Sequence, residues 1–222
     1  MADTQHKVYV ITGAAGSGKT SVANYLRRQY HMMKVITHTT RQPRPGEQNG
    51  VDYFFETPAS MDKLHLLERV EYDHHLYGSS LEGLERGWND DRDDVIVLDT
   101  AGAITYQQQL GDRVVVIFLT VSNVRTLSKR LYSRGDRTAA IHSRLHSAEY
   151  QRDLSLPTEL KGHAHVIVND NWEQTQQKLD QLIKNQQVKN NGCSRKSKDD
   201  GTGTRYALDA AARAINHHSA IK

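Results

Sequence analysis

The sequence predicts an α/β fold in which helices cover both faces of a mostly parallel sheet. Short apolar runs recur along the chain, among them residues 8–11, 95–98 and 114–119, and segments with helical periodicity separate them. Such alternation of strand and helix is typical of parallel sheets. The length of 222 residues suits one domain of this class with a short extension.

A glycine-rich turn, GAAGSGKT, follows the first apolar run and precedes the first helical segment. It fits the pattern G-x-x-x-x-G-K-[ST], in which backbone N–H groups and a helix N-terminus surround a phosphate. This placement between a strand and a helix favours a phosphate-binding loop (P-loop) over an ordinary surface turn. The predicted phosphate contacts are Gly13, Ala14, Ala15, Gly16, Ser17, Gly18, Lys19 and Thr20.

The other expected elements alternate in the same way. Met61, Leu64, Leu66 and Leu67 suggest one apolar face of a helix that begins near Thr57-Pro58. Further strands are expected at 34–37, 53–55, 70–72 and 166–168, and further helices at 81–86, 102–110, after Ser122-Asn123, around Arg137 to Glu149, and from Trp172 to about Gln186. The stretch 37–93 interrupts the alternation and predicts an inserted subdomain.

Composition restricts the classes of protein that fit. A formal net charge of +3 lacks the dense basic field of a nucleic-acid binder. One cysteine, Cys193, excludes an internal disulfide and suits a reducing compartment. No signal pattern is present, and the longest apolar run, Val114 to Leu119, is too short to span a bilayer. We expect a cytoplasmic protein with no membrane or nucleic-acid partner, and residues 187–222 are expected to form a polar linker and tail.

Several motifs occur together in one order: the P-loop, T-x-T-T-R-x-P-R-x-G-E-x-N-G-x-D-Y, V-E-Y, Y-G-S, R-L-x-x-R-G and V-I-V-N-D. With them the sequence resembles the guanylate kinase family from about Lys7 to Gln186. The resemblance implies a P-loop NTPase-type domain over residues 1–186, with a GMP-binding insert at about 37–93 and a lid at about 134–148. It also implies transfer of a phosphoryl group from ATP to GMP with Mg²⁺.

The resemblance assigns roles to individual positions. Thr20 would contact Mg²⁺, and Asn169 would join the P-loop in binding ATP. Lys19, Arg41 and three lid arginines, Arg130, Arg134 and Arg144, would neutralise the transferring phosphoryl group. The GMP site would consist of Thr37, Arg41, Arg44, Glu47, Tyr53, Glu71, Tyr77, Ser79 and Asp99.

Base selection is assigned to Glu71, because a carboxylate can accept both N1–H and N2–H₂ of guanine and has no such partners on adenine. Asp99 fits either the guanine amino group or the Mg²⁺ shell. Three features depart from the family pattern: His38 stands where a serine is common, one acid replaces D-x-D at Asp99, and the link from Glu71 to Tyr77 is short.

Two other functions fit the sequence. One is a kinase of the same architecture that acts on another phosphorylated acceptor, although Glu71, Tyr53 and Tyr77 favour a guanine nucleotide. The other is a non-catalytic interaction module, against which Lys19 and Thr20 argue. The sequence leaves the oligomeric state open.

Overall fold

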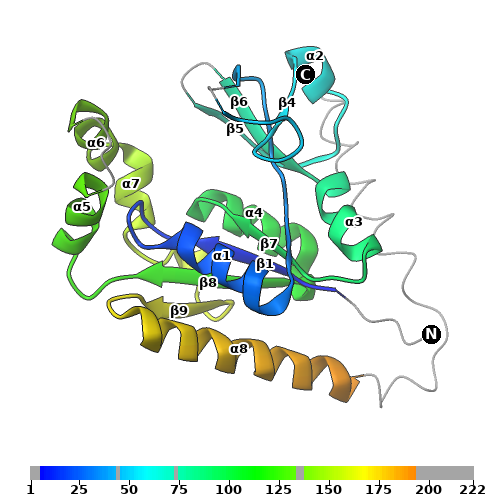
Figure 1. Ribbon diagram of the computed structural model, residues 1–222, viewed down its shortest axis with the longest axis vertical. Coiled ribbons are helices and arrows are strands. Elements are labelled where there is room, and N and C mark those ends of the chain that lie inside the picture. Colours follow the sequence, from blue (N-terminus) through cyan, green and yellow to red (C-terminus); the bar gives the residue numbers. More distant parts are fainter. Residues whose placement is uncertain (1–5, 44–45, 73–74, 134–137, 194–222) are drawn as a thin grey trace.

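The computed structural model describes residues 6–43, 46–72, 75–133 and 138–193. Two sheets organise this part of the chain (Figure 1). The central sheet has the strand order β2-β7-β1-β8-β9, and all of its strand pairs are parallel. Its strands are β1 (Val8–Thr12), β2 (Met33–Lys34), β7 (Asp94–Val97), β8 (Val114–Thr120) and β9 (Ala164–Val168).

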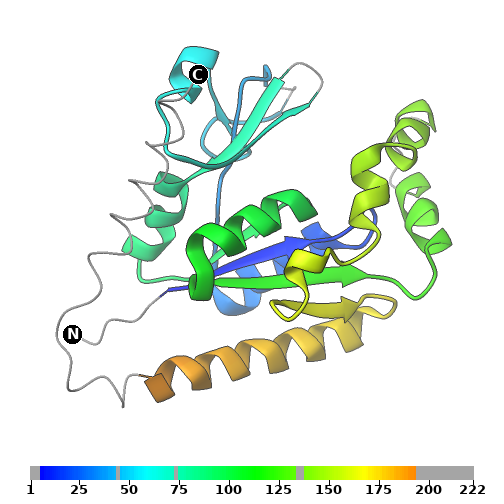
Figure 2. The ribbon, with the colours of Figure 1, turned by 180° about the vertical axis from the view of Figure 1, so that it is seen from behind.

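Helices cover both faces of the central sheet, as the sequence predicts. One apolar cluster joins its strands to α1 (Lys19–Tyr30) and α8 (Trp172–Cys193). A second cluster joins the opposite face to α4 (Thr100–Leu110), which crosses in front of the sheet in Figure 2. This packing fixes the carboxyl ends of β1 and β7 side by side, at the edge where the P-loop begins.

The insert forms a second sheet with the order β4-β3-β6-β5. Strands β3 and β4 are parallel, whereas β6 is antiparallel to both β3 and β5. The strands are β3 (His38–Thr39), β4 (Phe54–Phe55), β5 (Leu66–Tyr72) and β6 (His75–Ser80). Helix α2 (Pro58–Met61) connects β4 to β5, and α3 (Leu81–Asn89) follows β6.

The lid region contains three short helices beside the carboxyl end of β8 (Figure 1): α5 (Arg125–Tyr132), α6 (Thr138–Leu145) and α7 (Ala148–Asp153). The 3-10 turns η1 (Gly111–Arg113) and η2 (Thr158–Leu160) precede β8 and β9. No helix of the described ranges is long and apolar enough to cross a membrane.

Three predicted elements differ from the structure. The helix near Thr57 has only four residues, and Leu66 and Leu67 belong to β5 instead. Apolar residues at 61, 64, 66 and 67 fit the spacing of a helix. In the structure, however, residues from 66 onward form β5, whose pairing with β6 satisfies their backbone hydrogen-bonding groups. Of the predicted strand 34–37, only Lys34 lies in a strand, β2; residues 35–37 connect it to β3, which belongs to the other sheet. Helix α8 continues past Gln186 to Cys193.

Candidate active site

The P-loop connects β1 to α1 through backbone conformations that favour glycine. Gly13 has φ of 125° and Gly18 has φ of 99°. A Cβ atom at Gly13 would also collide with the carbonyl oxygen of Leu119 on β8. The loop therefore packs against the central sheet without side chains between them, and Gly18 directly precedes the N-terminus of α1.

The ammonium group of Lys19 lies over this loop. Its Nζ donates to the carbonyl oxygens of Gly13 at 2.5 Å and Ala14 at 3.1 Å. Thr20 follows on the first turn of α1 and is exposed. The cation and the hydroxyl predicted to bind phosphate and metal thus both lie at the rim of the loop.

Asn169 and Arg130, which are far from the P-loop in the sequence, donate hydrogen bonds to its backbone, and Arg130 also donates to Asn169. The side-chain amide of Asn169 donates to the Ser17 carbonyl at 2.8 Å and accepts from the Thr175 hydroxyl at 2.9 Å. Arg130 donates to the Asn169 carbonyl at 2.9 Å and to the Gly16 carbonyl at 3.5 Å. These residues border a pocket of about 840 Å³ that also includes Trp172. Arg130 and Asn169 are therefore next to the P-loop.

Arg41 is the centre of a polar cluster on the second sheet. Its guanidinium donates to both carboxylate oxygens of Glu47 at 3.0 Å and lies 5.5 Å from the ring centroid of Tyr53. The rings of Tyr53 and Tyr77 are 6.3 Å apart. Burial alone would lower the pKa of Arg41, but hydrogen bonds to Glu47 and Tyr77 outweigh it and raise that pKa. A planar cation framed by tyrosines is suited to bind phosphate.

The structure places Glu71 away from this cluster. Cross-strand pairing joins Glu68 to Ser79 and Val70 to Tyr77, so these residues share one face of the sheet. Glu71 pairs with Leu76 on the opposite face, and its side chain is exposed. Strand alternation thus assigns Glu68, which we did not select from the sequence, to the face of Tyr77 and Ser79. The link to Tyr77 is short when it is counted from Glu71, and it is three residues longer when it is counted from Glu68.

Glu68 lies at the end of a hydrogen-bonded chain. The Tyr106 hydroxyl of α4 donates to Ser79 Oγ at 2.8 Å, and Ser79 Oγ donates to Glu68 Oε1 at 3.2 Å. Burial raises the pKa of Glu68 to about 7; the Ser79 hydrogen bond opposes this rise and the charge of Asp99 adds to it. A half-buried carboxylate with a raised pKa suits a ligand that brings hydrogen-bond donors.

Asp99 follows β7, and its carboxylate is fixed on two sides. Oδ1 accepts the Gly102 N–H at 2.7 Å and caps α4. Oδ2 accepts from Arg152 of α7 at 2.7 Å. Because β1 and β7 are parallel neighbours, Asp99 and the P-loop lie at the same edge of the sheet. The described residues contain no cluster of three or more His, Cys, Asp or Glu suited to hold a metal.

His38 points into the interior of the subdomain. Its Nδ1 is 3.0 Å from Glu56 Oε1 and its Nε2 is 2.9 Å from Ser80 Oγ, while the ring stacks on Phe54. The order acid, histidine, serine resembles a catalytic triad. However, Ser80 is fully buried and already accepts the Gly83 N–H, so the group is structural. His38 pairs with Gly78 and thus lies on the face opposite Tyr77.

Some predicted residues cannot be placed. Arg44 and Arg134 lie outside the described residues. Arg144 belongs to α6, but its side chain is outside them too. Thr37 is half-buried just before β3, and its carbonyl accepts the Phe54 N–H at 2.9 Å.

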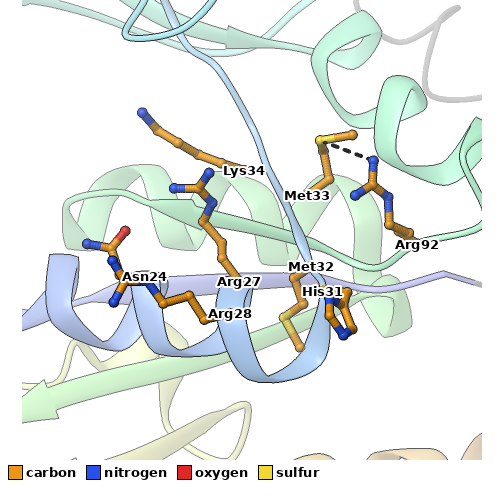
Figure 3. Close-up of a pocket in the computed structure, with 8 residues that line it drawn as sticks. All are labelled: Asn24, Arg27, Arg28, His31, Met32, Met33, Lys34 and Arg92. Atoms are coloured by element: carbon orange, nitrogen blue, oxygen red, sulfur yellow. Dashed lines mark hydrogen bonds between the residues drawn. The ribbon is translucent and has the colours of Figure 1, made fainter.

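A separate pocket of about 380 Å³ lies at the C-terminal end of α1. Figure 3 shows Arg27, Arg28 and Lys34 on one side of the view and Arg92 beside Met33 on the other. Its lining contains no acidic residue, but Arg92 donates to Asp90 at 2.7 Å just outside. Basic side chains at this end also complement the helix dipole, which accounts for Arg27 and Arg28 without a ligand.

The site combines a P-loop on a parallel sheet with Arg130 beside it and an arginine–tyrosine cluster on the inserted subdomain. Together these features define a P-loop kinase that acts on nucleotides. The guanylate kinase family profile matches residues 5–186. The chain is 34% identical to a guanylate kinase of Synechococcus sp. (strain JA-3-3Ab) over 81% of this chain and 83% of that protein. It is 31% identical to one of Rickettsia bellii (strain RML369-C), over 86% of this chain and all of that protein.

A solved structure gives the same fold. The crystal structure of guanylate kinase from Anaplasma phagocytophilum aligns with a TM-score of 0.56 and 24% identity, and covers 82% of this chain and 86% of that one. The chain therefore belongs to the guanylate kinase family.

Proposed function

We propose that this chain transfers the γ-phosphoryl group of ATP to GMP, giving ADP and GDP. The observation that carries the proposal is the presence of two complementary sites. The central sheet presents a P-loop, and the second sheet presents Arg41 between tyrosines with the buried carboxylate of Glu68. A kinase that joins two nucleotides through their phosphates needs both sites.

On the donor side, the P-loop amides and Lys19 bind the ATP phosphates. Lys19 leaves the carbonyl groups of Gly13 and Ala14 when a phosphate replaces them. The Thr20 hydroxyl and the Asp99 carboxylate fit Mg²⁺, because this ion prefers oxygen ligands and both groups lie at the same sheet edge. When bound, Mg²⁺ neutralises charge on the transferring phosphates.

On the acceptor side, Arg41 binds the GMP phosphate together with Tyr53 and Tyr77, and Arg44 assists it. Both carboxylate oxygens of Glu47 accept from Nη2 of Arg41, and this contact orients the remaining N–H groups of the guanidinium.

We assign recognition of the base to Glu68 in place of Glu71. An ionised Glu68 accepts N1–H and N2–H₂ of guanine, whereas adenine leaves the buried carboxylate opposite an acceptor nitrogen. Thr37 and Ser79 add hydroxyl groups at this subsite, and Ser79 already donates to Glu68.

Arg130, with Arg134 and Arg144, closes on the phosphoryl group during transfer. No covalent intermediate is required, because positioning and charge neutralisation lower the barrier to direct transfer. We place the reaction in the cytoplasm, because a reducing compartment suits a chain with a single cysteine. The catalytic domain extends through α8 to Cys193 rather than ending at Gln186, and the predicted linker and tail beyond it lie outside the described residues.

An ADP-release assay that compares GMP, dGMP, AMP and CMP as acceptors tests the proposal. We expect high turnover with GMP and at least a hundredfold lower kcat/KM with AMP. Equal rates with all four acceptors would show that the acceptor is a different phosphorylated compound. ATP binding without any turnover would point to an interaction module.

A further inference from the structure

Helix α7 contacts two parts of the donor site that are far apart in the sequence. Tyr150 packs in one buried cluster with Ala14 of the P-loop and Leu127 of α5. Two residues later, Arg152 donates through Nη2 to Asp99 Oδ2 at 2.7 Å. One short helix therefore connects the loop that binds phosphate to the carboxylate at the end of β7.

The contact between Arg152 and Asp99 is not needed to attach α7 to the core. Asp153, which is 7% exposed, accepts from both the hydroxyl and the N–H of Thr100, at 2.6 and 3.3 Å. Arg152 Nε also donates to Asp153 Oδ1 at 2.9 Å and to Thr100 Oγ1 at 3.0 Å. Asp153 and Thr100 thus attach the helix to the core beside Arg152, whose Nη2 donates to Asp99.

Asp99 needs a second partner to hold one orientation. Among the described residues its Oδ1 accepts one hydrogen bond, from the Gly102 N–H, and its side chain is 35% exposed. One hydrogen bond leaves rotation about the side-chain bonds open, whereas a second one on the other oxygen fixes the plane of the carboxylate.

We propose that Arg152 is a positioning residue for the donor site, which fixes the Asp99 carboxylate and thereby couples α7 to the end of β7 beside the P-loop. The proposal rests on the proposed function, because it assumes that Asp99 serves the phosphate site. Arg152 acts through Asp99 and does not itself contact a nucleotide.

A double-mutant cycle tests this role. We expect Arg152→Gln to lower kcat/KM for phosphoryl transfer about tenfold, as is common when a positioning contact is lost. In an Asp99→Asn background the same substitution should change kcat/KM less than twofold, because the charged carboxylate that pairs with Arg152 is absent. Arg152→Lys should keep most of the activity, since an ammonium group can still pair with Asp99.

Arg92→Gln is the matched control, since Arg92 also pairs with an aspartate, Asp90, at 2.7 Å and is 40% exposed. It should leave kcat/KM unchanged. The proposal is overturned if Arg152→Gln has no effect in the parent, or if it costs as much in the Asp99→Asn background as in the parent. The second result would mean that Arg152 acts through Thr100 and Asp153 on the packing of α7.

The same set of variants is also compared by calorimetric titration with MgATP in the absence of an acceptor. The effect of Arg152→Gln on the MgATP dissociation constant should likewise disappear in the Asp99→Asn background. If the parent proves inactive with GMP, the proposed acceptor is wrong, but this titration still decides the role of Arg152.

Discussion

Replacing Glu68 by glutamine removes a charge without changing the size of the side chain. Guanine offers two donors to this carboxylate, and a glutamine can accept from only one of them while its amide N–H₂ opposes the other. A hydrogen bond to a charged group contributes roughly 1.5–3 kcal/mol. The loss of one such bond, with one donor left unpaired, should cost about 3 kcal/mol. That corresponds to a decrease of about a hundredfold in kcat/KM for GMP.

The pH profile gives an independent measurement of the same group. Because the pKa of Glu68 is raised to about 7, its ionised fraction increases between pH 6 and pH 8. The kcat/KM for GMP in the parent should therefore rise roughly tenfold over that range. The Glu68→Gln variant should not show this rise, since glutamine does not titrate.

Glu71→Gln is the matched control, because Glu71 lies three residues further along the same strand with its side chain exposed. It should change kcat/KM for GMP less than twofold. Steady-state ADP release with GMP and AMP, over pH 6 to 8, measures all three proteins. Our assignment of the base site is refuted if Glu71→Gln reduces the preference for GMP over AMP while Glu68→Gln retains it.

Three further predictions concern other sites. Lys19→Ala should lower kcat by at least about a hundredfold, while circular dichroism shows an unchanged fold; wild-type turnover would contradict its role. Arg41→Lys should raise KM for GMP about tenfold with little change in KM for ATP, since lysine lacks the bidentate fork; equal changes in both constants would count against it. Asp94 is buried, neither carboxylate oxygen has a hydrogen-bond partner among the described residues, and burial raises its pKa to about 8. The folded protein thus retains a proton that the unfolded chain releases, so stability should fall from about pH 4 to pH 8 by up to about 1.4 kcal/mol per unit. Asp94→Asn should flatten this slope in thermal melts, and a slope equal to that of the parent would show that Asp94 does not cause it.

The parts of the fold that depend on local sequence were predictable. The P-loop is a contiguous motif, and β1, β7 and β8 contain continuous apolar runs because both faces of that sheet are covered. The sequence alone therefore locates β1, β7 and β8 and the loop after β1.

The pairing of β5 with β6 was harder to predict, because it depends on hairpin register. Glu68 and Glu71 are both strand carboxylates, and the sequence around each looks similar. Their faces differ only once Ser79 is known to pair with Glu68. Counting outward from the pair Tyr72 and His75 to Tyr77 and Ser79 would have supplied this register. The length of β5 was underestimated for the same reason, since Leu66 and Leu67 were assigned to a helix.

The contacts of Asp99 could not be read from the sequence. Arg152 is 53 residues away from it, and nothing in the sequence near Arg152 distinguishes it from other arginines of the basic helices. Only the packing of α7 on the core brings the two together.

The amide of Asn169 bridges to Ser17 across 152 residues. During synthesis on the ribosome, the phosphate loop emerges long before this brace, because Asn169 directly follows β9. A nascent chain therefore carries an incomplete nucleotide cradle until β9 has paired with β8, and competence to hold ATP should arise late in translation.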